Sequence, residues 1–373
     1  MSSVQPPMGG AQPGSQAWGT AGAPAGGGLP PYAPPRENRS VSFFVAIFLG
    51  LLLLVSAGLN VVLLLLSLGT LAGGMGGGID DGQYQVVATG GEKGAKMKVL
   101  RIPLVGAIAE ARSAVIGAGG GSVSDVRRGL RLAASDRDIR GVVLDINSPG
   151  GGVTDSDEIH DLVKKFRAEH PDKKVVAMFG DLAASGGYYV AAAADHILAR
   201  PTTITGSIGV IMSSWNFAEA AKKLGVTEVS IKSARTPYKD MLSMTRPMTD
   251  EERAMLTSIV DEMYDRFVTV VDEGRPALDR AQVTALANGG IYSAGQALAN
   301  GLVDQLGDDA ALQEWFESRL GGKVAFQEQR RVPGLRDLFG VMAREPGTAA
   351  DLAAQLLTEG SGPRFLYWWP GAR

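Results

Sequence analysis

Ser185 is the residue of this sequence best placed to act as a nucleophile. It follows the apolar stretch Leu182–Ala184 and precedes Gly186–Tyr189, a pattern typical of a strand that turns into a helix. The glycines leave room for a substrate backbone, and the helix N-terminus would favour a developing negative charge. The alternative role is an ordinary helix N-cap. The G-x-S-x-G motif of α/β-hydrolases is not met, because Ala183 stands at its first glycine.

A second glycine-rich turn, Ser148–Gly152, follows the apolar stretch Gly141–Ile146, which is typical of a buried strand. Successive glycines let the backbone turn sharply and bring free N–H groups up to a ligand. In acyl transfer such groups stabilise the tetrahedral oxyanion. A structural turn before the next helix is the plain alternative. A phosphate cradle is another, although the lysine-containing phosphate-loop pattern is absent.

Spacing alone does not identify the group that would take the proton of this serine. His196 lies at the far end of the helix that begins at Ser185, about 15 Å away at 1.5 Å per residue. His160 and His170 lie on or just beyond a predicted surface helix. A lysine becomes a base only when burial or nearby positive charge keeps it neutral. Lys239, in a polar loop, is a candidate, although a lysine beside an aspartate is commonly a solvated surface residue.

Composition excludes several other functions. The net charge is −3, and no window of the main body is basic enough to form a stripe that binds nucleic acid. The absence of cysteine excludes disulfides, thiolate metal sites and cysteine nucleophiles. Because the sequence holds only three histidines, we do not expect a metal site built on histidine clusters. Acyl transfer by a serine requires no metal or nucleotide, so we expect no cofactor either.

The N-terminal part predicts a membrane anchor. Residues 1–40 are rich in glycine and proline, which is typical of a disordered cytoplasmic tail. Residues 41–71 contain an uncharged apolar run long enough to cross a bilayer as a helix. Residues 72–96 begin with a glycine cluster and predict a flexible linker. A buried core helix and a cleaved signal peptide are the alternatives, but the run is longer and begins later than a signal peptide's apolar region.

Charges flanking the apolar run predict its orientation. Arg36 and Arg39 precede it, whereas Asp80 and Asp81 follow it. The positive-inside rule therefore keeps the N-terminal tail in the cytoplasm and places the large C-terminal part on the far side of the membrane.

From residue 97 onward, stretches typical of strands and of helices alternate. Strands are expected at 98–108, 141–146, 174–179 and 196–199, and helices at 123–135, 155–170 and 185–194. Alternation of this kind implies βαβ units and a largely parallel sheet, that is, an α/β fold. Thr249–Glu252 has the capping-box pattern that opens a helix, here extending to about Glu273.

Four motifs occur in an order that resembles the signal peptide peptidase A (SppA) family. They are Asp145–Gly152, Ala183–Tyr189, Thr205–Ile211 and Gly301–Asp304. The resemblance covers residues 97–325, with 326–373 as a C-terminal extension. It implies a membrane-anchored serine endopeptidase with a Clp protease/crotonase-like fold, acting on signal peptides and other small extended peptides. It also implies a homo-oligomeric ring, octameric for chains without a tandem duplication, in an inner or cytoplasmic membrane.

The resemblance assigns a role to each candidate residue. Ser185 is expected to be the nucleophile and Lys239 the general base, with Ser207 orienting that lysine. The N–H groups of Gly151 and Gly186 are expected to form the oxyanion hole. The loop before Lys239 is about two residues longer than the family pattern, so Lys232 is the alternative base.

The sequence leaves two alternative functions and the role of one segment undecided. A crotonase-like acyl-CoA enzyme would share the fold, and a non-catalytic membrane scaffold would retain the domain without its chemistry. The extension predicts helices at Asp337–Ala343 and Ala349–Leu357 and ends in the apolar cluster Phe365–Trp369. That cluster could pack on a neighbouring subunit, insert at a membrane interface or occupy the protease groove.

Overall fold

The computed structural model describes residues 39–74, 84–110, 121–331 and 365–368. The chain divides into two compact units, Met1–Ile79 and Asp80–Arg373. Outside the described residues lie nearly all of the predicted tail at 1–40, the end of the glycine cluster, and both helices predicted within 332–364.

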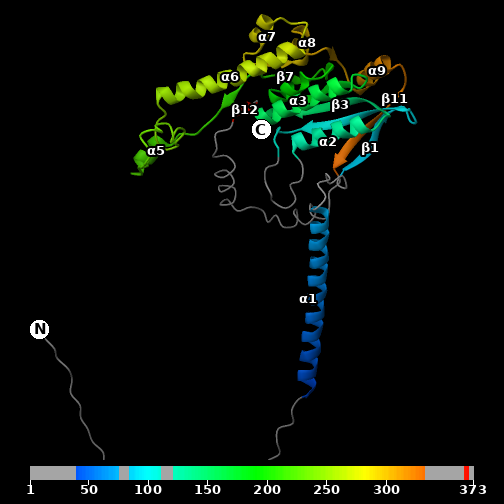
Figure 1. Cartoon of the computed structure of the whole chain (residues 1–373), viewed down its shortest axis with the longest axis vertical. Coiled ribbons are helices and arrows are strands. Elements are labelled where there is room, and N and C mark those ends of the chain that lie inside the picture. The colour runs from blue at the N-terminus through cyan, green and yellow to red at the C-terminus, as the bar shows by residue number, and fades with distance from the viewer. Residues whose placement is uncertain (1–38, 75–83, 111–120, 332–364, 369–373) are drawn as a thin grey trace, which may run out of the picture. The chain divides into compact units, whose positions relative to one another are not determined.

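The first unit contains one long helix, α1 (Arg39–Gly74), drawn in blue in Figure 1. Its stretch Phe43–Val61 is long and apolar enough to cross a membrane, and none of it is buried. A helix with no buried side chains in this stretch is not the core helix of a soluble domain, which was one alternative. The predicted anchor at 41–71 therefore lies wholly within α1, which also takes in the first residues of the predicted linker.

The second unit is built around a nine-stranded sheet in the order β1-β11-β2-β3-β5-β6-β10. Pairing is parallel along this path except between β1 and β11. The strands are β1 (Tyr84–Gly91), β2 (Met97–Val105), β3 (Ile139–Ser148), β5 (Lys174–Ala184), β6 (His196–Ala199), β10 (Gln305–Leu306) and β11 (Val324–Arg331). Beyond β6, β7 (Ile204–Gly206) pairs with β5 in parallel and with β9 (Ile291–Ser293) antiparallel.

Burial on both faces explains the apolar character of the central strands. Val142 and Leu144 of β3 belong to one core cluster, whereas Val143 between them belongs to the other. Side chains alternate between the faces of a strand, so a strand covered on both sides must be apolar throughout. The predicted α/β class with a parallel sheet is confirmed.

Helices cover both faces of this sheet. The larger core cluster takes residues from α2, α3, α4, α6 and the short helices after it, while α9 supplies Leu312 and Phe316 to the smaller one. The helices are α2 (Ser122–Ser135), α3 (Val153–Glu169), α4 (Gly186–Ala191), α6 (Asp250–Gly274), α7 (Arg280–Leu286), α8 (Ala294–Ala299) and α9 (Asp309–Leu320). The predicted capping box opens α6, because Thr249 and Glu252 exchange side-chain and backbone bonds of 3.2 and 3.0 Å.

The expected boundaries of the domain differ from those of the sheet. Strand β1 lies inside the stretch 72–96, where a flexible linker is expected, and pairs with β11 over most of its length. β11 in turn runs past residue 325 into the expected extension. Seven of the eight residues of the edge strand β1 are exposed. Its sequence therefore lacks the alternation of apolar and polar residues by which a half-buried strand is predicted.

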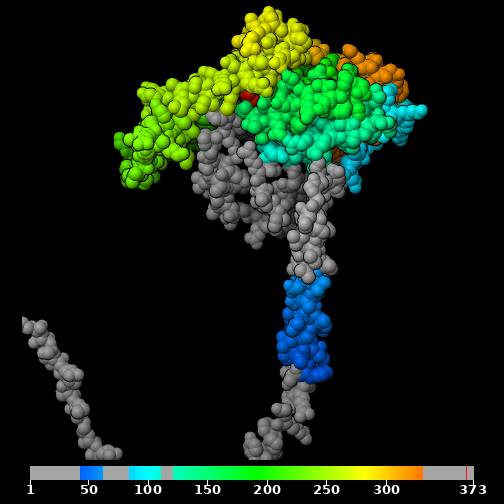
Figure 2. Space-filling view, in the orientation of Figure 1, coloured from blue at the N-terminus to red at the C-terminus, as the bar shows by residue number. Residues whose placement is uncertain are grey.

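Between the sheet and α6 the chain forms an arm, defined here as residues 213–248, which contains α5 (Ala218–Lys223). Figures 1 and 2 show α5 at the far end of α6, away from the sheet. Near its N-terminal end α6 leaves Met255 exposed and buries Leu256, whereas Phe267 in its C-terminal half is fully buried.

A second, three-stranded sheet stands beside the first. It has the order β4-β12-β8, where β4 is Gly150–Gly152, β8 is Ile211–Met212 and β12 is Phe365–Trp368. Both pairings of β12 are antiparallel. Thus a segment from the far end of the sequence lies between the glycine turn and the strand that leads into the arm.

Candidate active site

Ser185 stands at the junction of β5 and α4 in a rare backbone conformation. Its φ is 54° and its ψ is −116°, a combination that costs an L-residue about 1–3 kcal/mol and is found mainly at functional sites. Its amide donates to Gly206 O at 2.8 Å, and its carbonyl accepts from Tyr189 N at 2.9 Å. These backbone bonds hold the turn in place, and they do not involve the side-chain hydroxyl.

The Ser185 hydroxyl is fully buried and has no hydrogen-bond partner among the described residues. It does not cap α4, since the side chain makes no capping bond. The ordinary N-cap role considered for this serine is therefore absent from the structure. Burying a hydroxyl without a hydrogen-bond partner costs free energy. Such an unpartnered group is typical of a catalytic site.

Ser207 lies immediately beside this junction. Strand β7 pairs with the end of β5 so that Ala184 and Gly206 are register partners, and each is followed by one of the two serines. Ser207 is 6% exposed, its φ is 49°, and its amide donates to Gly290 O at 2.7 Å. The structure therefore brings Ser185 and Ser207 to the ends of two paired strands, as the sequence led us to expect them near each other.

The two predicted oxyanion-hole glycines also lie together. A Cβ on Gly186 would come within 3.1 Å of Gly151 N and 2.5 Å of Ser156 Oγ. Gly150 has a φ of 101°, and a Cβ there would lie 2.6 Å from Gly186 N. A side chain at Gly150 would collide with the backbone and one at Gly186 with Ser156 Oγ, so glycine fits best where the two turns meet.

Neither candidate base contacts Ser185 within the described residues. Both lysines belong to the arm. Lys239 is exposed, and none of the described residues bonds its ammonium group. Lys232 donates to Pro237 O at 2.7 Å and forms an ion pair with Asp240. Lys232 is thus engaged locally, whereas Lys239 is available to another partner.

The histidines serve the core rather than the serine. His160 packs edge-on against Tyr189 with ring centroids 5.3 Å apart, and burial lowers its pKa. His196 stacks on Trp315 at 5.0 Å, and burial lowers its pKa as well. Packed, buried imidazoles of this kind stabilise the fold, and among the described residues neither hydrogen-bonds to Ser185.

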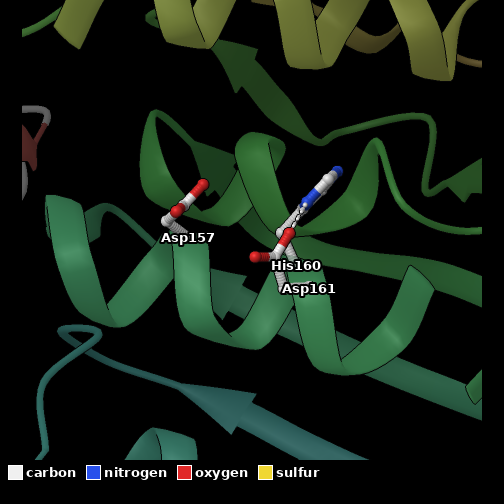
Figure 3. A group of neighbouring side chains, drawn as sticks. All are labelled: Asp157, His160 and Asp161. Atoms are coloured by element: carbon white, nitrogen blue, oxygen red, sulfur yellow. Dashed lines mark hydrogen bonds and ion pairs between the residues drawn. The ribbon is translucent and has the colours of Figure 1, made fainter. Parts of the chain in front are cut away.

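Asp157, His160 and Asp161 lie together on α3 (Figure 3). Asp157 accepts from the Tyr189 hydroxyl and from Arg266 Nε and Nη2 at 3.1 and 2.9 Å. The pKa of Tyr189 is raised above its ordinary range, first by burial and then by this bond. Asp157 therefore fixes the side chain of Tyr189, four residues after Ser185.

Sequence reasoning missed the residues that support the site from behind. Ser156 is fully buried with an unpartnered hydroxyl next to Gly186. Tyr188 donates to Leu302 O at 2.8 Å from a fully buried ring. A serine in the first turn of a helix and a tyrosine in an apolar run carry no local signal of these contacts.

The late motif Gly301–Asp304 connects three elements behind α4. Arg275, at the end of α6, donates to Gly301 O at 2.9 Å and pairs with both carboxylate oxygens of Asp304. Asp304 also accepts from Ile197 N of β6 at 2.7 Å. This motif thus connects α6 and β6 behind α4, the helix that follows Ser185.

Known proteins share this stretch of sequence. The model of peptidase family S49 matches residues 167–321, which contain Ser185, Ser207 and Lys239 but not Gly151. A protein of Synechocystis assigned as a protease is 38% identical over 226 residues, which cover 61% of this chain and 76% of that protein. This chain belongs to peptidase family S49.

An S49 relative from Enterococcus faecium, assigned as signal peptide peptidase SppA, is 43% identical over 178 residues. That match covers 48% of this chain and 50% of the relative, so the chain spans about half of that relative's length. The predicted family and the predicted enzyme class, a peptidase, are confirmed at the level of S49.

Among solved structures, a mutant of ClpP1 from Listeria monocytogenes has a TM-score of 0.36 and 16% identity to this S49 chain. The match covers 56% of this chain and 91% of ClpP1. The sheet itself establishes the α/β class, and the sequence matches establish the family.

Proposed function

We propose that this protein is a membrane-bound serine endopeptidase that cleaves signal peptides and other small extended peptides. The observation that carries the proposal is the buried, unpartnered hydroxyl of Ser185, held in a strained turn beside Gly151 and Gly186. Membership of S49 adds a peptidase context to that geometry. No cofactor takes part in the proposed chemistry.

In the proposed reaction, Ser185 Oγ attacks the carbonyl carbon of the scissile bond. The amides of Gly151 and Gly186 bind the oxyanion that forms. The amine of Lys239 accepts the serine proton and then gives it to the leaving amine as the C–N bond breaks. Water hydrolyses the acyl-enzyme by the same route, which restores the serine. Ser207 orients the amine of Lys239.

The base is proposed to come from a neighbouring copy of the chain. Lys239 is exposed on an arm that leaves the body, and Ser185 is buried in that body. The arm also exposes large apolar side chains that a second copy would cover: Trp215 is 76% exposed, Val229 81% and Ile231 97%. Apolar patches of this kind mark interfaces, and a repeated head-to-tail contact closes into a ring.

The proposed location follows from α1 and its flanking charges. α1 is long and apolar enough to anchor the chain in the inner or cytoplasmic membrane. Arg36 and Arg39 on one side keep that end in the cytoplasm. The catalytic unit is then extracytoplasmic.

The test is hydrolysis of a fluorogenic apolar peptide by the full chain in detergent, beside three variants. Ser185→Ala and Lys239→Ala should abolish turnover, whereas Lys232→Ala should retain it. Activity that survives Lys239→Ala but not Lys232→Ala would move the base to Lys232. If folded, assembled protein shows no turnover, the proposal fails. Binding of acyl-CoA would then favour the crotonase-like enzyme, and its absence the scaffold.

A further inference from the structure

Asn147 belongs to the Asp145–Gly152 motif but takes no part in the proposed reaction. It lies near the end of β3, where the register between β3 and β5 shifts. At this point the single residue Asn147 faces three residues of β5, 180–182, which therefore form a bulge. Bulges bend a strand, redirect the residues that follow and are common next to active sites.

The bulge marks the place where β5 changes its neighbour. Up to Phe179, β5 pairs with β6, and from Leu182 onward it pairs with β7. The pairing with β7 continues to Ala184, and Ser185 N then donates to Gly206 O at 2.8 Å. The conformation of the bulge therefore decides where β7 pairs with β5 and, with it, where Ser185 emerges from the sheet.

The side chain of Asn147 holds this bulge in place. Its Oδ1 accepts a hydrogen bond from Leu182 N at 3.1 Å. A Cβ on Gly180 would lie 3.1 Å from Asn147 Cβ and 3.2 Å from Asn147 Cγ, so the side chain lies directly against the bulged backbone. The main chain of Asn147 is itself fixed to the end of β2, because its carbonyl accepts from Gly106 N at 2.9 Å. Asn147 thus reaches from a fixed strand across to the bulge.

The bond between Asn147 and Leu182 connects the two halves of the candidate site. Leu182 of β5 is three residues before Ser185, and Asn147 of β3 is four residues before Gly151. Acyl transfer depends on the distance between the nucleophile and the oxyanion donors, and a displacement of about 1 Å can cost about 100-fold in rate. A bond that joins the two strands so near their ends is placed to set that distance.

We propose that Asn147 is a positioning residue. Through its bond to Leu182 N it sets the placement of Ser185 relative to the amide of Gly151. Asn147 is exposed, and substitutions at exposed sites usually change stability little, so its effect falls on the geometry of the site rather than on folding. This inference rests on the proposed function, which supplies the roles of Ser185 and Gly151.

Two substitutions separate the hydrogen-bond acceptor from the size of the side chain. Asn147→Leu removes the acceptor and keeps the size, so kcat on the fluorogenic peptide should fall about 10- to 100-fold, with KM within about twofold of the wild type. Asn147→Asp keeps an acceptor oxygen and should have a kcat within about threefold of the wild type. A wild-type kcat in Asn147→Leu, or an equal loss in Asn147→Asp, would overturn the inference.

Thr203→Val is the matched control for a general loosening of the bulge. Thr203 Oγ1 donates to Gly180 O at 2.7 Å, so this side chain supports the same bulge from the side of β7. The variant should unfold at a lower temperature than the wild type and keep its kcat. An equal loss of kcat in Thr203→Val and Asn147→Leu would assign the effect to the bulge as a whole and overturn a specific role for Asn147.

Hydrogen–deuterium exchange of the full chain in detergent tests the positioning without catalysis. In Asn147→Leu, the amides of residues 182–185 should exchange about three- to tenfold faster than in the wild type, as expected for the loss of one hydrogen bond. Exchange at residues 175–178, earlier in β5, should not change, and Asn147→Asp should match the wild type. Unchanged exchange at 182–185 in Asn147→Leu would overturn the inference even if the peptidase proved inactive. An inactive wild type with the expected exchange pattern would refute the proposed function and support the positioning of Ser185 by Asn147.

Discussion

Ser185 and Ser207 lie at the ends of two paired strands, and each has a left-handed backbone, with φ angles of 54° and 49°. The amide of Ser185 donates to Gly206 O, so the turn containing one serine is bonded to the residue before the other. Only one other non-glycine residue of the described chain, Leu242, has a positive φ. Two such turns bonded together fix both hydroxyls relative to the sheet.

A hydroxyl at position 207 should matter for catalysis rather than for folding. We expect Ser207→Ala to lower kcat by about 10- to 100-fold while KM stays unchanged. This is at or below the lower end of the roughly 10²–10⁴-fold that a proton-transfer group itself supplies, because Ser207 is proposed only to orient that group. Steady-state kinetics on the fluorogenic peptide measures this split.

Ser207→Gly is the matched control for backbone strain. Because glycine tolerates a positive φ, Ser207→Gly should unfold at a higher temperature than Ser207→Ala. Its kcat should fall as much as that of Ser207→Ala, since both variants lack the hydroxyl. A kcat for either variant equal to that of the wild type would contradict a role for Ser207 in the reaction.

Gly150→Ala should inactivate the enzyme. A Cβ there would lie less than 3.0 Å from Gly186 N and Tyr367 O, at a φ of 101° that strains any L-residue. We expect loss of turnover and a lower unfolding temperature, measured by kinetics and by calorimetry. Gly295→Ala is the control, because nothing lies within 4 Å of its Cβ position. Full activity in Gly150→Ala would show that the glycine turn does not adjoin the groove.

Asp304→Asn should destabilise the catalytic unit by about 3 kcal/mol, since it leaves the buried Arg275 guanidinium without its charged partner. Urea unfolding of the full chain in detergent measures the change. Lys323→Gln, which breaks the more exposed pair with Glu317, should cost less than about 1 kcal/mol. Comparable losses in the two variants would argue against a special role for the Gly301–Asp304 motif.

Stability should fall as the pH drops below the ordinary histidine pKa of 6.5. Burial lowers the pKa of His160 in the folded state, so the unfolded chain binds the proton first and is favoured at acidic pH. Above pH 6.5 both states hold a neutral imidazole and the effect vanishes.

Urea unfolding at pH 5 and pH 8 checks this sign. His160→Gln should reduce the difference in unfolding free energy between pH 5 and pH 8. The burial-lowered pKa of His196 should account for part of the difference that remains. A pH difference unchanged by His160→Gln would contradict the assignment.

Ile231→Glu should separate the copies of the chain without unfolding them. Ile231 is 97% exposed on the arm, so a charge there costs the single chain little but opposes burial in an interface. Analytical ultracentrifugation should show a smaller assembly, and turnover should disappear with it. Val86→Glu, at a 46% exposed site on β1, should change neither. A single-copy wild type would exclude the proposed ring.

The sequence predicted the placement of the candidate residues where the signal is local. Ser185 and Gly151 each follow an apolar run typical of a buried strand, and parallel strands bring their ends together. Strand β1 was missed because its partner β11 is more than two hundred residues away and its exposed face carries no alternation. For the aromatic cluster at 365–369 the sequence left three alternatives open. The pairing of β12 with β4 and β8 depends on edges that only the folded chain presents.

The separation of Ser185 from Lys239 affects when the protein would become active. Under the proposed mechanism, a newly made chain carries a nucleophile with nothing to activate it. It is harmless to the machinery that synthesises and exports it. Catalytic power would then appear only when enough copies have gathered in the plane of the membrane, so the enzyme's threshold would be set by its own abundance.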